Sequence, residues 1–139
     1  MKIVCQPVDA AGADTGSPIT LGDDSVGDYI VGPPFRAESR LVDQAPLYGA
    51  ATPYTNDQGN RRNSYSWTVE REHATKAAAT AFNLGHANSL PGNCRLTITE
   101  GAADWRHAGC TFTAVECVLQ TGIATTFRYS ITGGTLASA

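Results

Sequence analysis

Alternation of apolar and polar residues along positions 64–70 constrains the fold of this chain more than any other feature. Tyr65, Trp67 and Val69 fall on one face of an extended segment, and the residues between them are polar. Successive side chains of a β-strand point to opposite faces, so the pattern predicts a half-buried strand. Residues 94–98 repeat the pattern, which predicts a second strand of the same kind.

The phase of this alternation changes inside a third predicted strand. Two apolar sets follow one another there on opposite phases: Cys110, Phe112 and Ala114, then Val115, Cys117 and Leu119. One extra residue turns every later side chain to the other face, so a β-bulge is predicted near Ala114 and Val115. A loop over residues 101–109 is predicted before this strand, and a tight turn at Thr121–Gly122 after it.

The alanine-rich segment from Ala74 to Leu90 is predicted to be a helix. Small residues recur in it at helical spacing around one large residue: Ala74, Ala78, Ala81, Phe82, Gly85 and Ser89. This face is expected to pack on a sheet, with Phe82 as its buried anchor. Thr75 is a suitable N-cap, and Pro91 stops the helix.

Shorter patterns predict the remaining elements. Strands are expected at residues 2–7, 19–21, 29–31 and 35–42, and in a last strand where Ile123, Phe127, Tyr129 and Ile131 share a face before Gly133–Gly134 ends it. Residues 46–63 are rich in turn formers and lack periodicity, which predicts a long loop. The predicted fold is one α+β, mainly β domain over residues 1–139. It is expected to be an antiparallel β-sandwich or split barrel with one flanking helix at about residues 74–90.

Composition favours a folded protein that stays in the cytoplasm where it is made. Hydrophobic residues make up 42% of the chain and charged residues 17%, and the first residues lack an apolar signal-peptide core. The four cysteines are therefore expected to be reduced and buried as small hydrophobic residues, and three of them, Cys94, Cys110 and Cys117, lie in phase with core residues of the predicted strands. A net charge of −3 is not that of a nucleic-acid binder, and no apolar run is long enough to cross a membrane.

The sequence patterns predict no catalytic residue, metal site or cofactor. No Gly-x-Ser-x-Gly motif frames a serine, and the cysteines and histidines lack zinc-ligand spacing. His73, at the start of the predicted helix, is interpreted as exposed, and His86 and His107 receive the same interpretation. Glu70 and Glu72 share one face of their strand and, with Arg71 as their neighbour, are interpreted as a charged outer face and not as paired catalytic carboxylates.

The order of segments between residues 47 and 134 also bears on function. Leu47-Tyr48-Gly49 and Gly59-Asn60-Arg61-Arg62-Asn63 precede the strand from Tyr65 to Arg71, and then come the helix, a strand-loop-strand unit and the closing segment 126–134. This layout resembles the tail-tube and distal-tail proteins of tailed phages and prophages. In those small virion proteins a β-sandwich or barrel with one flanking helix forms rings.

The resemblance implies a non-enzymatic structural protein that needs no cofactor. Its subunits would form a homo-oligomeric ring or tube with other tail proteins, in a virion assembled in the host bacterial cytoplasm. DNA would pass through an acidic lumen without specific binding, because like charges repel. The candidate subunit interface lies in or beside the predicted loop and comprises Tyr48, Tyr54, Arg61 and Arg62. The two arginines would pair with carboxylates of a neighbouring subunit, or else be solvated at the end of the loop.

Three alternatives to this interpretation stay open. A head–tail joining or tail-terminator protein also forms rings. A monomeric β-rich binding module would instead present residues 46–63 to a ligand, and a small hydrolase would need a triad that no motif marks. The oligomeric state separates the ring-forming proteins from the binding module.

Overall fold

The computed structural model describes residues 1–32, 38–44, 54–62 and 64–138. The strands are β1 (Lys2–Pro7), β2 (Ile19–Asp23), β3 (Tyr29–Val31), β4 (Glu38–Gln44), β5 (Tyr54–Arg62), β6 (Ser64–Glu72), β7 (Asn93–Glu100), β8 (Ala103–Thr121) and β9 (Ala124–Ser138). One α-helix, α1 (Lys76–Ser89), lies between β6 and β7, and a 3₁₀ turn (Asp24–Val26) joins β2 to β3. The predicted α+β, mainly β fold is confirmed.

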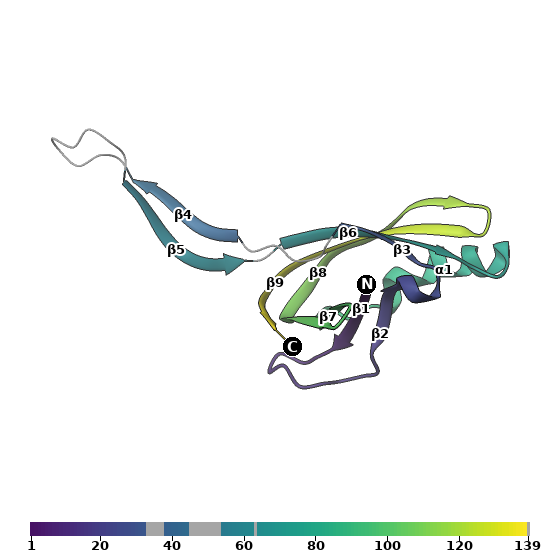
Figure 1. The fold of residues 1–139 in the computed structure, drawn as a ribbon, viewed down its shortest axis with the longest axis horizontal. Helices are drawn as coiled ribbons and strands as arrows, with labels where there is room; N and C mark the ends of the chain where they lie inside the picture. Colours follow the sequence, from purple (N-terminus) through teal and green to yellow (C-terminus); the bar gives the residue numbers. More distant parts are fainter. Residues whose placement is uncertain (33–37, 45–53, 63, 139) are drawn as a thin grey trace.

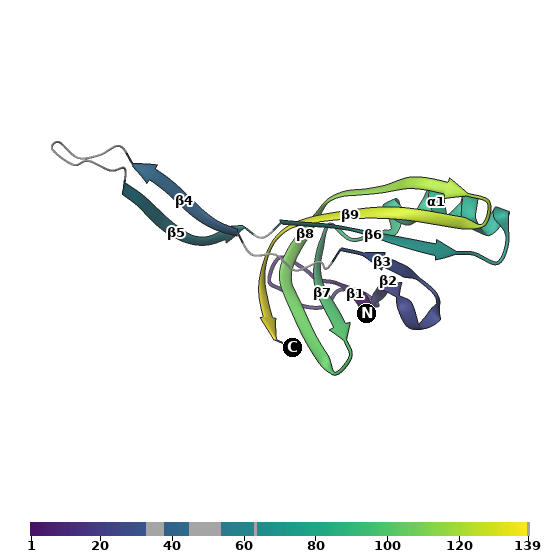
Figure 2. The ribbon, with the colours of Figure 1, turned by 45° about the horizontal axis from the view of Figure 1, so that its top comes forward.

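Seven strands form one antiparallel sheet in the order β2-β1-β7-β8-β9-β6-β3, and β4 pairs with β5 in a separate hairpin. The large sheet is strongly curved, and α1 lies beside the turn-bearing ends of β8 and β9 (Figures 1 and 2). The sheet is not closed, because β2 and β3 are its two end strands.

The hydrophobic core lies on the inner face of the curved sheet. The predicted alternations supply most of it, with Tyr65, Trp67 and Val69 from β6 and with inward-facing residues of β7 and β9. Thirteen buried residues form this cluster: Ile3, Cys5, Leu21, Tyr65, Trp67, Val69, Cys94, Leu96, Ile98, Cys110, Phe127, Tyr129 and Ile131. Burial as small hydrophobic residues is confirmed for Cys5, Cys94 and Cys110, but Cys117, which was also expected in the core, is only half-buried.

The predicted β-bulge is confirmed in β8. Its register against β9 shifts between Phe112 and Ala114, and Phe112, Val115 and Cys117 all pack against the core. A second shift between Cys117 and Leu119 was not predicted. The second bulge turns Leu119 outward, where 58% of it is exposed, so its assignment to the apolar face was wrong.

Two predicted interruptions of the sheet were also wrong. Residues 103–109 belong to β8 and pair with both neighbouring strands, so the predicted loop shrinks to a turn before Ala103. Gly133 and Gly134 do not end β9, which continues to Ser138. Both glycines have positive φ angles, 84° and 83°, and a Cβ on Gly134 would stand 2.8 Å from the Ala108 carbonyl oxygen. The positive φ angles favour glycine at both positions, and at Gly134 the missing side chain also lets β9 lie close to β8.

The helix begins as predicted, but it faces the sheet with a different side. The Thr75 hydroxyl oxygen accepts a hydrogen bond from the Ala78 N–H, which confirms the N-cap. The covered side carries Ala79, Phe82 and His86, whereas the predicted Ala78, Ala81, Gly85 and Ser89 are exposed. Because alanine and glycine favour neither side strongly, the larger residues set the orientation. Phe82 is half-buried rather than buried.

Residues 54–62 form a strand and not part of a loop, which corrects the prediction for that portion of residues 46–63. They pair with β4, from Glu38 opposite Arg62 to Gln44 opposite Tyr54, with irregular register near Ser39. Asn, Asp and Gly disfavour strands, and β5 contains four such residues, so its sequence does not show a strand pattern. The rest of the predicted loop, residues 46–53 and 63, lies outside the described residues.

Candidate functional site

The most distinctive surface element is the β4–β5 hairpin, which extends away from the curved sheet as an arm (Figures 1 and 2). Among the described strands, neither β4 nor β5 pairs with the seven-stranded sheet. Of the four predicted interface residues, Tyr54, Arg61 and Arg62 lie on β5. Tyr54 is at the strand's outer end and the two arginines are at the end nearer the sheet. Tyr48 lies outside the described residues.

Asp28 holds the two end strands of the large sheet together. Its carboxylate accepts hydrogen bonds from the Asp23 backbone N–H (3.0 Å) and from the Arg71 guanidinium, with Nη2 at 2.9 Å. The Asp28 N–H donates to the Asp23 carbonyl oxygen at 3.2 Å. Asp28 therefore connects the end of β2 to β6 and, through β6, to β3. In the seven-stranded sheet, β2 and β3 are the two end strands and do not pair with each other.

Glu70 and Glu72 are exposed, as predicted for a charged outer face, whereas Arg71 between them points inward. It continues the inward phase of Tyr65, Trp67 and Val69, and its guanidinium carbon lies 5.3 Å from the centre of the Phe82 ring. A cation over an aromatic face is attracted by the electrons of the ring. Arg71 thus joins the Asp28 contact to the packing of α1.

Two histidines interpreted as exposed are buried and bonded to tyrosines. His86 Nε2 lies 2.6 Å from the Tyr129 hydroxyl. The fully buried His107 ring is hydrogen-bonded to the Tyr65 hydroxyl. Burial lowers the pKa of each histidine to about 4, with a smaller effect of Arg71 on His86. Burial also raises the pKa of the Tyr129 hydroxyl. At neutral pH both pairs are therefore hydrogen bonds between uncharged side chains in the core.

His73 takes a third position, between the surface and the core. Its Nε2 lies 2.9 Å from the Thr125 hydroxyl, and its ring packs against Phe82 at a centroid distance of 4.8 Å. Burial and the nearby Arg71 lower its pKa. His73 fixes the connection between β6 and α1 to β9, which is a structural role.

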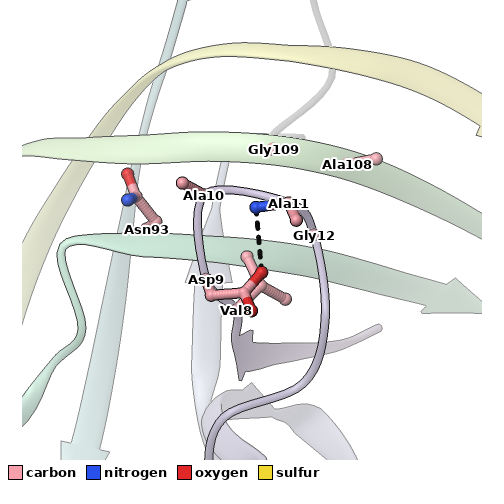
Figure 3. Close-up of a pocket in the computed structure, with 8 residues that line it drawn as sticks. All are labelled: Val8, Asp9, Ala10, Ala11, Gly12, Asn93, Ala108 and Gly109. Carbon is pink, nitrogen blue, oxygen red and sulfur yellow. Dashed lines mark hydrogen bonds between the residues drawn. The ribbon is translucent and has the colours of Figure 1, made fainter.

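A surface pocket of about 370 Å³ lies between the β1–β2 connection and the middle of β8 (Figure 3). The carboxylate of Asp9 is its one acidic group, and this group already accepts hydrogen bonds from the Ala11 and Ala13 N–H groups. Asn93 accepts a hydrogen bond from Thr111. The polar side chains of this pocket thus serve the fold, and the rest of its lining is Ala, Gly and Val.

The described residues contain no group of three or more His, Cys, Asp or Glu side chains that could hold a metal ion. No helix within residues 1–32 and 64–138 is long and apolar enough to cross a membrane. Comparisons with protein-family models, curated proteins and solved structures find no match to this chain.

Sequence reasoning missed Asp28, Arg71, His86 and His107. For Arg71 the signal was present, because it lies two residues after Val69 on the inward phase of β6. His86 follows Phe82 by four residues and so shares its side of the helix. Asp28 gave no signal, because its partners come from distant segments of the chain.

Proposed function

We propose that this chain is a non-enzymatic structural subunit of a phage tail or tail-like particle, which assembles with copies of itself into rings or a tube. The observation that carries the proposal is the projecting β4–β5 arm. An isolated two-stranded hairpin is at best marginally stable in water. A neighbouring subunit that packs against the arm would stabilise it.

The composition of the arm supports a role in contact between subunits. Arg61 and Arg62 lie at its base, and arginine forks form paired hydrogen bonds with carboxylates across interfaces. Both long edges of a two-stranded ribbon also present backbone N–H and C=O groups for pairing. The arm of one subunit would contact a different surface on the next, and such head-to-tail contacts close into rings.

The interior of the protein is consistent with a structural role. His86 and His107 are neutral and buried, and the inward Arg71 joins strands through Asp28. A net charge of −3 per subunit makes a multimeric ring strongly negative. DNA would then pass through the lumen without binding, because both carry negative charge.

The proposal is tested by removing the two charges of the arm. Arg61→Ala with Arg62→Ala should reduce the amount of ring or tube seen by electron microscopy and in sedimented material. A control with the same loss of charge combines Lys76→Ala on exposed α1 with Arg95→Ala, whose partner is the exposed Asp14. The control should assemble normally. Equal assembly by both double variants, with unchanged circular dichroism, would contradict the interface assignment.

Hydrogen exchange provides an independent reading of the same interface. Amides of residues 54–62 should exchange rapidly in the isolated subunit and slowly in assembled material. Amides of β9 opposite β6 should be protected in both states, because they pair within the large sheet. Full protection of residues 54–62 in the isolated subunit would count against the proposal.

A further inference from the structure

Cys94 and Cys110 are direct neighbours across β7 and β8. They are register partners, and their Sγ atoms lie 3.3 Å apart. Opposite residues of antiparallel strands have Cα atoms about 4.5–5.5 Å apart, within the range of about 4.4–6.8 Å that a disulfide requires. Closing the Sγ–Sγ separation to about 2.05 Å therefore needs small side-chain rotations and no rearrangement of the strands.

Cys5 is a third thiol beside this pair, but it is placed less favourably. It pairs with Leu96 across β1 and β7, so it is a diagonal neighbour of Cys94. Diagonal neighbours stand about 7–8 Å apart at Cα, at or beyond the upper end of the range for a disulfide. The geometry thus selects Cys94 and Cys110 from the three buried cysteines.

We propose that Cys94 and Cys110 are a covalent modification site, which forms a disulfide across β7 and β8 when the chain meets a disulfide oxidant. One thiolate attacks a sulfur of the oxidant, forming a mixed disulfide and releasing one thiol of the oxidant. The second protein thiolate then attacks the protein sulfur of that mixed disulfide and releases the other thiol. The protein loses two protons and two electrons, and the oxidant takes them up to become two thiols.

Burial makes this bond slow to form in the closed sheet. Both side chains are fully buried. The hydrogen bond with Cys110 lowers the pKa of Cys94, but contact with Cys5 and burial outweigh it and raise the pKa to about 12. The contact with Cys94 and burial also raise the pKa of Cys110. The thiolate is the reacting form, so exchange should be faster at higher pH and after local opening of β7.

The bond would stabilise the folded chain. It closes a loop between residues 16 positions apart. In the chain-entropy treatment, a loop of this size favours the folded state about 100-fold. This inference does not depend on the proposed role in a tail.

The test uses the full chain with Cys117→Ser, which removes the half-buried thiol. The protein is equilibrated in mixtures of reduced and oxidised glutathione, with and without urea, then acid-quenched and digested with trypsin. Mass spectrometry should find peptide 77–95 joined to peptide 107–128, with a loss of about 2 Da. The equilibrium constant for the bond should be about 100-fold larger in the folded chain than in urea, and the melting temperature should rise by about 10 °C.

Two further variants identify the pair. Cys5→Ala should keep the bond, and Cys94→Ala should abolish it. If Cys94→Ala fails to fold, peptide mapping of the parent protein still decides the pairing. A bond from peptide 3–36 to peptide 77–95, no bond, or equal constants in folded and unfolded protein would each overturn the inference.

Discussion

Replacing Asp28 with alanine should destabilise the domain by opening the junction between β2 and β6. The Asp28 side chain is 5% exposed, and it accepts hydrogen bonds from the Arg71 guanidinium and the Asp23 N–H. Alanine removes all of these acceptors. The Arg71 charge then loses its partner, and the Asp23 N–H loses a bond at the open edge of the sheet.

The size of the effect follows from the burial of the two partners. Removing one member of a fully buried ion pair costs about 3–5 kcal/mol, and hydrogen bonds to charged groups contribute about 1.5–3 kcal/mol. Arg71 is 26% exposed and can turn partly toward water, which reduces the cost. We expect Asp28→Ala to lower the free energy of unfolding by about 2–4 kcal/mol. Asp28→Asn keeps an acceptor for Asp23 and should cost about half as much.

Urea unfolding followed by tryptophan fluorescence measures this change, because Trp67 is 2% exposed in the folded chain. Asp14→Ala is the matched control. It removes a carboxylate from an exposed pair with Arg95 and should cost less than about 1 kcal/mol. A double-mutant cycle of Asp28→Ala with Arg71→Gln should give a coupling above about 1 kcal/mol. A cost for Asp28→Ala no larger than the control, or a coupling near zero, would refute the reasoning.

Three other changes probe the core. Phe82→Ala should cost about 2–4 kcal/mol in urea unfolding, because the ring packs on His86 and Phe127, whereas Leu84→Ala, at a residue 75% exposed, should cost little. Gly22→Ala should cost about 1–3 kcal/mol by the same measurement, because a Cβ there would stand 3.0 Å from Ile30 Cδ1. The pKa values of His86 and His107 are about 4 in the folded chain, whereas the ordinary value is 6.5. Between pH 4 and pH 6.5 the unfolded chain therefore binds more protons than the folded chain. The free energy of unfolding should therefore be fully retained above pH 6.5 and fall toward pH 4, by on the order of 3 kcal/mol per histidine, and His107→Gln should make this dependence shallower.

Much of the large sheet could be predicted because several of its strands have a clear alternation of apolar and polar residues. Tyr65, Trp67 and Val69 alternate without interruption, and the sequence around Thr113 shows the phase change that a bulge produces. These features depend on neighbouring residues of one strand. They can therefore be recognised in the sequence without knowledge of contacts to distant segments.

The errors arise where distant segments decide the structure. Residues 103–109 are a strand because β7 and β9 pair with them on both sides, although their own sequence contains a charged pair and a glycine. β5 pairs with β4 despite its strand-poor composition. The contact of Asp28 with Arg71 joins residues 43 positions apart, and no local pattern records it. For the candidate interface, sequence reasoning named residues of the arm but did not predict the hairpin that carries them.

The central claim, assembly with copies of the same chain, is tested most directly by size-exclusion chromatography with light scattering at rising protein concentration. A ring-forming subunit should shift from the mass of one chain, 14.6 kDa, to a single larger species whose mass is a whole multiple of it. Arg61→Ala with Arg62→Ala should move that shift to higher concentration. A mass of 14.6 kDa that persists to the highest concentration reached would contradict the account and favour a monomeric binding module.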